Sequence, residues 1–139
     1  MAHQELAAFA AELSRDEWRL VPSRGEDRRP CGVVVHHVTD WTPRLTERAV
    51  ARAEGRQLLP LQVDEINAAH AAANPDPDQA ETVKLVRSTG TAAAARLLPL
   101  ADAQLQTGGE GGFTAEQTIE RVLIAHVRGH LEELRSALR

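Results

Sequence analysis

The sequence predicts an all-α protein, a four-helix bundle with a short extra helix between the second and third long helices. The chain has 139 residues, is rich in alanine, and contains no tyrosine and only 3% aromatic residues. Such a composition favours helices over sheets. Apolar residues also recur every three or four positions, the spacing of a helix that buries one face. At this length a single domain over residues 1–139 is the most economical organisation.

Charge and composition argue against several classes of partner. A net charge of −4 gives no electrostatic footprint for nucleic acid. The first residues lack the pattern of a signal peptide, and no run of eighteen apolar residues could span a membrane. Cys31 is the only cysteine, which excludes an internal disulfide and fits a reducing compartment. We therefore expect a cytoplasmic protein with neither nucleic-acid nor membrane partners.

The first half of the chain predicts two long helices. Apolar residues at helical spacing indicate a helix over residues 3–20, followed by a loop with two prolines and a glycine. Residues 31–55 begin with a β-branched run, but their apolar positions fall on one helical face. Pro43 is expected to bend this second helix or restart it, with Thr42 as a cap. Gly55 is expected to end it.

The middle of the chain is less regular. "VDEINAAHAAA" predicts the short extra helix, and "NPDPD" breaks it. From about Asp78 a third long helix runs through "QAETVKLVRSTGTAAAARLLPL", where Gly90 marks a kink or close packing. "LPLADAQL" is expected to form an irregular turn.

The last helix has a clear beginning. Before it, "QTGGEGGF" predicts a glycine-rich loop that lacks the Lys-Ser or Lys-Thr of a phosphate-binding loop. Thr114 and Gln117 have the spacing of a capping box, which places the start of the fourth long helix there.

Two histidines lie on the apolar stripe of this last helix. The stripe comprises Ile119, Leu123, His126, Val127, His130, Leu131, Leu134 and Leu138. His126 and His130 are one turn apart, with Cβ atoms about 6 Å from each other, which suits two ligands of one metal ion. His37 shares the apolar face of the second long helix and could supply a third ligand. Its neighbour His36 is rotated by roughly 100°, toward an edge.

The same histidines could instead be core residues with ordinary hydrogen bonds. A pair spaced by four residues is weak evidence for a metal, and one buried histidine is more often structural. Three together are harder to explain in that way, since each buried imidazole without a partner costs about 1–3 kcal/mol. From the residues alone, both interpretations stay open.

Two stretches of the sequence resemble motifs of a known family. "VVVHHVTDW" and "VLIAHVRGHLEEL" resemble the helix-2 and helix-4 motifs of the DinB-like (damage-inducible) family, which is related to mycothiol- and bacillithiol-dependent S-transferases and maleylpyruvate isomerases. The resemblance implies a four-helix bundle in which His37, His126 and His130 hold a divalent metal. Zinc is the first choice, and nickel, manganese, cobalt or iron also suit three histidines.

The resemblance also implies a chemistry. Three neutral histidines leave coordination positions open, and a divalent ion there lowers the pKa of a bound water or thiol. We therefore expect a low-molecular-weight-thiol S-transferase, with a small-molecule thiol such as mycothiol and an electrophile as partners. The alternative is a non-catalytic metal- or ligand-binding bundle in a stress response. A homodimer is compatible with the resemblance.

Other residues are weaker candidates for the site. Trp41 is expected in the core or on a pocket wall. Asn67 is expected to hydrogen-bond a ligand or to cap a turn. His70 is expected to contact a substrate, to act as a base near the site, or to lie exposed to solvent. Arg121 and Arg128 could clamp an anion, but we expect them on the solvated face of the last helix. Cys31 begins a helix, where a thiol pKa can fall, but we expect a structural role for it.

Overall fold

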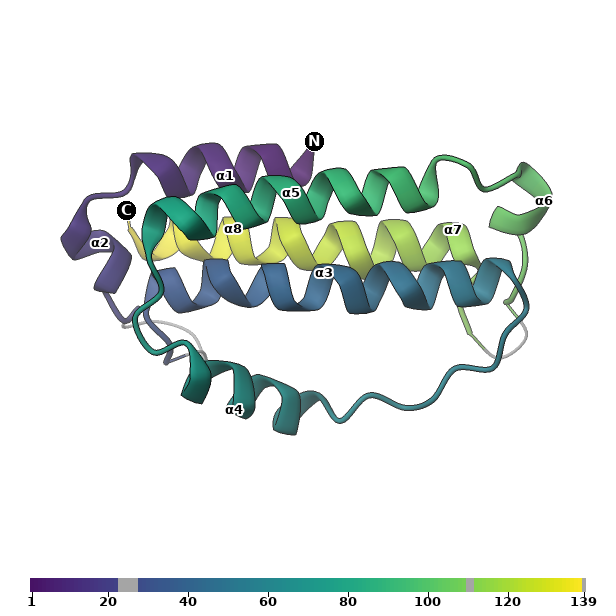
Figure 1. Ribbon diagram of the computed structural model, residues 1–139, viewed down its shortest axis with the longest axis horizontal. Helices are drawn as coiled ribbons and strands as arrows, with labels where there is room; N and C mark the ends of the chain where they lie inside the picture. The colour runs from purple at the N-terminus through teal and green to yellow at the C-terminus, as the bar shows by residue number, and fades with distance from the viewer. Residues whose placement is uncertain (23–27, 110–111, 139) are drawn as a thin grey trace.

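The computed structural model describes residues 1–22, 28–109 and 112–138, which form helices joined by turns and loops. In chain order the helices are α1 (Ala2–Glu12), α2 (Arg15–Arg19), α3 (Cys31–Ala53), α4 (Val63–Ala73), α5 (Gln79–Leu97), α6 (Asp102–Leu105), α7 (Ala115–Thr118), the π-helical segment η1 (Ile119–Ile124) and α8 (Ala125–Ala137). The last three follow one another without a break and form one long helix. The predicted all-α bundle is confirmed: α1, α3, α5 and the last helix lie side by side (Figure 1).

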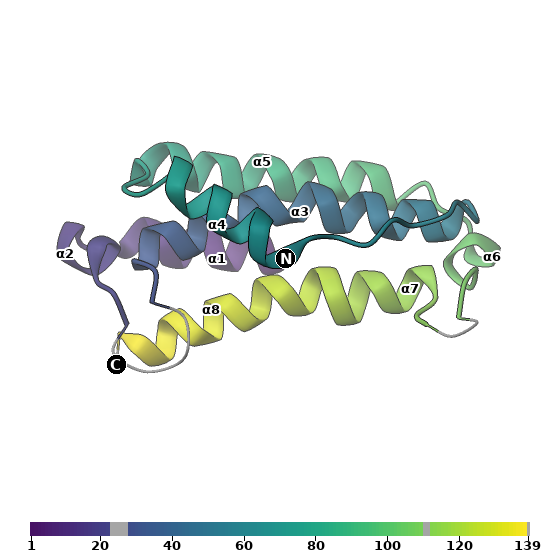
Figure 2. The same ribbon diagram turned by 90° about the horizontal axis from the view of Figure 1, so that it is seen from below.

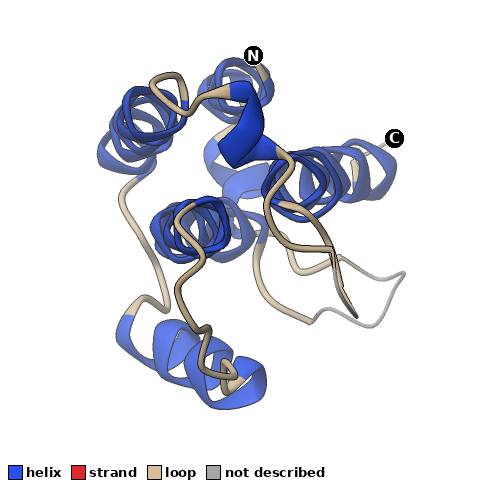
Figure 3. Ribbon diagram, turned by 90° about the vertical axis from the view of Figure 1, so that its right-hand side faces the viewer, coloured by secondary structure: helices blue, strands red, loops and turns tan. Residues whose placement is uncertain are grey.

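The short extra helix between the second and third long helices is also confirmed. It is α4, which lies outside the four bundled helices against one side of α3 (Figures 2 and 3). His70 is its buried residue. None of the described helices is long and apolar enough to cross a membrane.

The prediction of one helix over residues 3–20 is wrong, because the chain breaks at Ser14. The Glu17 N–H donates to Ser14 Oγ at 3.2 Å, and the Ser14 N–H donates to Glu17 Oε2 at 2.7 Å. This capping box ends α1 and starts α2 in a new direction. It turns the Trp18 indole inward, where its Nε1–H donates to the Pro77 carbonyl at 2.9 Å. Gly32 leaves room for that ring.

The expectation that Pro43 restarts the second long helix is also wrong. Helix α3 continues through Pro43, and Thr42 caps nothing: its hydroxyl donates to the Val38 carbonyl at 2.8 Å within the helix. Helix α3 lies at the centre of the bundle, so its packing outweighs the cost of one proline, about 3 kcal/mol. Gly55 ends the helix as predicted, with a φ of 68°.

At Gly90, helices α1 and α5 pack closely, which is one of the two roles predicted for this glycine. A Cβ at this position of α5 would lie 2.6 Å from the Cβ of His3, so the glycine lets α1 approach α5. The segment "LPLADAQL" is only partly irregular, because its second half forms the single turn α6.

The start of the last helix agrees with the prediction. The Gln117 N–H donates to Thr114 Oγ1, and the Thr114 N–H donates to Gln117 Oε1, both at 3.1 Å. The predicted glycine loop turns at Gly108 and Gly109, which have positive φ. Its residues 110–111 lie outside the described residues, as do residues 23–27 of the earlier loop.

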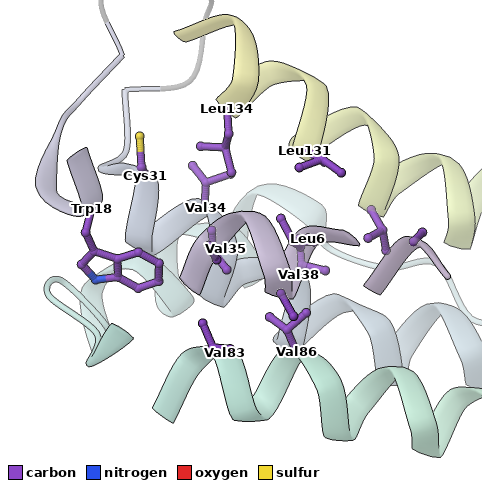
Figure 4. Packing of buried hydrophobic residues seen from close by; sticks show 14 residues of the cluster. Leu6, Trp18, Cys31, Val34, Val35, Val38, Val83, Val86, Leu131 and Leu134 are labelled. Atoms are coloured by element: carbon purple, nitrogen blue, oxygen red, sulfur yellow. The ribbon is translucent and has the colours of Figure 1, made fainter. Parts of the chain in front are cut away.

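The main core lies at one end of the bundle, where three valines of α3 contact α1, α5 and α8 (Figure 4). Its labelled members are Leu6, Trp18, Cys31, Val34, Val35, Val38, Val83, Val86, Leu131 and Leu134. A second cluster, of Trp41, Leu45 and Leu123, lies further along α3. Along α3, His37 lies among the valines of the main core, four residues before Trp41 of the second cluster.

Candidate metal centre

Three histidines from two helices meet beside the apolar core. His37 comes from α3, while His126 and His130 come from successive turns of α8. Each offers one ring nitrogen, and these three nitrogens lie within 4.8 Å of one another. Metal–imidazole bonds of about 2 Å place two ligand nitrogens roughly 3–4 Å apart. Small side-chain adjustments would therefore bring all three onto one ion.

The helix registers that produce this cluster are those expected from the apolar periodicity. His37 is 3% exposed, and its Nε2 lies 3.2 Å from Nε2 of His126. His36, one residue earlier, points away toward α4 and is partly exposed. His37 is thus the member of the doublet that faces the cluster.

The electrostatics keep two of the rings neutral. Burial lowers the pKa of His37 to about 2, and the nearby Arg29 guanidinium adds to this effect. Burial likewise lowers the pKa of His126 to about 4, with further contributions from His130 and Arg29. A neutral imidazole is the form that binds a metal, so at neutral pH protons do not compete for these two rings.

A carboxylate orients the third ring. His130 donates its Nδ1–H to Glu133 Oε2 at 3.0 Å, from one turn further along α8. The hydrogen bond fixes the proton on Nδ1 and leaves the Nε2 lone pair for the cluster. Carboxylate–histidine pairs of this kind support metal-binding histidines in many proteins.

Two ring nitrogens of the cluster lack a hydrogen bond. The Nδ1 atoms of His37 and His126 are buried and have no hydrogen-bond partner among the described residues. A metal bound at the Nε2 atoms, which face each other, would leave these Nδ1 groups as they are. What fits a divalent cation is the convergence of three imidazoles, two of them held neutral by burial.

The cluster opens onto a pocket of about 460 Å³. All three histidines line it, together with the apolar side chains of Leu45, Val63 and Val122. Trp41 and Asn67 also lie on its wall, and the Trp41 Nε1–H donates to Asn67 Oδ1 at 2.7 Å. Of the weaker candidates Trp41, Asn67 and His70, the structure thus brings the first two to the pocket beside the histidine cluster.

His70, the third of those candidates, lies beside His37, with the two ring centres 5.9 Å apart, but outside the pocket. Its expected exposure is wrong: the side chain is 6% exposed, and its Nε2 lies 2.8 Å from Nδ1 of His36. It is not among the described residues that line the pocket. Its hydrogen bond with His36 instead links α4 to α3.

Two arginines also line the pocket. Arg29 lines it from the segment before α3, and Arg121 lines it from η1. Arg29 was not among the predicted site residues. Arg121 was expected on the solvated face, and its side chain is indeed exposed, as is that of Arg128. The π-helical turn of η1 departs from the α-helical period on which that expectation relied.

Comparison with known protein families gives a match that includes the same histidine motifs. A model of the DinB superfamily matches residues 1–134, nearly the whole chain and all three clustered histidines. Neither a search of curated proteins nor a search of solved structures found a match.

Proposed function

Because this chain belongs to the DinB superfamily, we propose that His37, His126 and His130 hold one divalent metal ion, with zinc the first choice. We further propose that the protein transfers a low-molecular-weight thiol to a small electrophile. The observation that supports this most is the convergence of three imidazoles on the wall of an open pocket.

The metal site has the features of a catalytic one. A divalent ion held by three imidazoles has open coordination positions and lowers the pKa of a thiol bound beside it. Glu133 keeps His130 in the orientation that such an ion needs. The pocket volume lies within the range of small-molecule sites. Trp41 and the aliphatic wall residues give the same space a largely apolar lining.

The thiol in this proposal comes from outside the chain. Cys31 is fully buried in the main core, and burial raises the pKa of its thiol. A buried thiol of raised pKa is a poor nucleophile. This supports the structural role expected for Cys31 and leaves the nucleophile to a small molecule.

The rival proposal, a non-catalytic metal- or ligand-binding bundle, also requires a bound ion. The two proposals differ in whether a thiol is consumed. The open pocket beside the three histidines favours exchange of ligands, and so favours the transferase.

The first experiment measures metal content in protein purified without a His-tag or chelator. We expect about one equivalent of a divalent metal per chain, and loss of that metal in the His126→Ala/His130→Ala double variant. The metal-loaded protein is then supplied with low-molecular-weight thiols, including mycothiol and bacillithiol, and with model electrophiles. Metal-dependent consumption of a thiol is the expected result.

The outcomes separate the hypotheses. Metal without thiol turnover would favour the non-catalytic bundle. A wild-type protein that holds no metal, resists loading with zinc, nickel and manganese, and is no more stable than the double variant would overturn the metal site. The histidines would then be core residues.

A further inference from the structure

Two neighbouring histidines each have a buried ring nitrogen without a hydrogen bond. They are His37 of α3 and His70 of α4, and the atom is Nδ1 in both. Both side chains are buried, and the rings meet edge to face with their centres 5.9 Å apart. A buried polar group without a partner costs about 1–3 kcal/mol. Two such groups on adjacent rings suggest a contact that forms between them.

Metal binding would fix the position of the proton on His37. Its Nε2 faces Nε2 of His126 at 3.2 Å, so this is the nitrogen that a shared ion would take. A neutral imidazole bound through Nε2 carries its proton on Nδ1 and has a donor there. Metal-binding histidines almost always give that second N–H to an acceptor, as His130 gives its Nδ1–H to Glu133. His37 therefore needs an acceptor at Nδ1.

The other aromatic rings around His37 do not offer one. The Trp41 indole has a donor only, and its N–H is already bonded. His126 and His130 meet His37 within the cluster itself, where their nitrogens would face the ion. His70 is the remaining ring in contact with His37, and its Nδ1 is unused.

The hydrogen bond to His36 determines whether His70 can accept. His36 Nδ1 lies 2.8 Å from His70 Nε2, with one proton between them. If His70 donates its Nε2–H, its Nδ1 is free to accept from His37. If His36 donates instead, His70 carries its own proton on Nδ1, which would face a second buried N–H. The first arrangement gives both buried nitrogens a partner, and the second gives neither one.

We propose that His70 is a positioning residue for His37: its Nδ1 accepts the His37 Nδ1–H, while its Nε2–H is donated to His36. The proposal rests on the proposed function, because the metal is what keeps the proton of His37 on Nδ1. The hydrogen-bonded rings of His36 and His70 have centres 5.0 Å apart, so His37 and His70 need an approach only slightly closer than 5.9 Å. Helix α4 would thus support the metal site through a residue outside the pocket.

Two substitutions of His70 separate this role from the attachment of α4 to α3. The amide oxygen of asparagine occupies the place of imidazole Nδ1, whereas the amide group of glutamine reaches the place of Nε2. His70→Asn therefore keeps an acceptor for His37 and loses the bond to His36. His70→Gln keeps a donor for His36 and loses the acceptor for His37.

Zinc affinity, measured by competition with a chelator, should follow the acceptor. We expect His70→Gln to lower the affinity about 10–100-fold and His70→Asn to stay close to the wild type. Amide hydrogen exchange in α4 should follow the opposite order, faster in His70→Asn and close to the wild type in His70→Gln. If His70→Asn loses as much zinc affinity as His70→Gln, or if neither variant loses any, the positioning role is wrong.

The ring nitrogens give a second readout that needs neither metal nor substitution. Their ¹⁵N chemical shifts distinguish a histidine protonated on Nδ1 from one protonated on Nε2. We expect the proton of His37 on Nδ1 and that of His70 on Nε2, in zinc-loaded and in chelator-treated protein. A proton on Nδ1 of His70 would overturn the proposal. Protein that takes up no zinc yet shows the expected protons would refute the metal site and support the bond between His37 and His70.

Discussion

At the scale of single residues, the candidate centre depends on how each imidazole presents its lone pair. His37 and His126 are held neutral by burial. His130 is more accessible and relies on a hydrogen bond, with its Nδ1–H donated to Glu133. One carboxylate therefore decides which nitrogen of His130, the third proposed ligand, faces the cluster.

This dependence predicts the effect of Glu133→Gln. The glutamine keeps the size of the side chain but removes the charge that stabilises the Nδ1–H tautomer of His130. Changes to such supporting groups lower metal affinity by about 10–100-fold, and we expect a loss in that range. Zinc affinity measured by competition with a chromogenic chelator is the readout.

Glu132→Gln is the control for that experiment. Glu132 is the exposed neighbour on the same helix and carries the same charge. If both variants lose affinity equally, the cause is the net charge near the site, and the orienting role of Glu133 is wrong.

At the scale of elements, α1 is held against the bundle by a partly buried histidine. His3 lies where Gly90 opens α5, and its Nε2 is 2.8 Å from Thr42 Oγ1. The Thr42 hydroxyl already donates to the Val38 carbonyl, so it accepts a hydrogen bond from His3. Three helices thus meet at one polar contact, and burial lowers the pKa of His3 below 6.5.

The lowered pKa makes the docking of α1 sensitive to acid. Below pH 6.5 the unfolded chain takes up a proton at His3 more readily than the folded chain does. The contribution of His3 to the free energy of unfolding is therefore present above pH 6.5 and is lost as the pH falls toward its folded pKa. His3→Gln, which can still donate to Thr42, should remove this dependence.

Urea denaturation of the chelator-treated proteins between pH 5 and pH 8 provides the measurement. The wild type should lose more stability than His3→Gln over this interval. Both proteins keep the other buried histidines, so the difference between them isolates His3. Parallel stability curves would show that His3 does not couple α1 docking to pH.

At the scale of the whole molecule, the four bundled helices and α4 differ in how they are held. The bundled helices share the buried apolar clusters, whereas α4 buries one residue, His70, and packs the partly buried Ile66 against the second cluster. Two polar contacts attach α4 to α3, from Trp41 to Asn67 and from His36 to His70. Because α4 supplies Val63 and Asn67 to the pocket wall, its attachment sets the shape of the pocket.

Weak attachment predicts that α4 opens independently of the bundle. An Asn67→Ala/His36→Ala double variant should raise amide hydrogen exchange in residues 63–73 by about tenfold or more, because each lost hydrogen bond contributes about 1 kcal/mol. Exchange in α3 and α8 should change little. Glu65→Ala, an exposed site on the same helix, is the control. Equal increases in α4 and the bundle would show that α4 belongs to one cooperative unit with it.

Local signals in the sequence predicted much of this architecture. Helical periodicity, the Thr114 cap and Gly55 located three of the long helices, and the short α4 was predicted with its observed bounds. The break at Ser14 could also have been predicted from the sequence, since Ser14 and Glu17 have the spacing of a capping box. The continuity of α3 through Pro43 was not, because it depends on packing around the central helix.

The sequence by itself determined the all-α fold and the placement of the three histidines on apolar helical faces. Residue type and a period of 3.6 assign a side chain to a face of its own helix, independently of the helices that pack against that face. Only the tertiary structure decided what surrounds them. It placed Arg29 and Arg121 on the pocket wall and turned His70 toward His36. Those positions depend on a π-helical segment and on the docking of α4, and the period of an ideal helix describes neither.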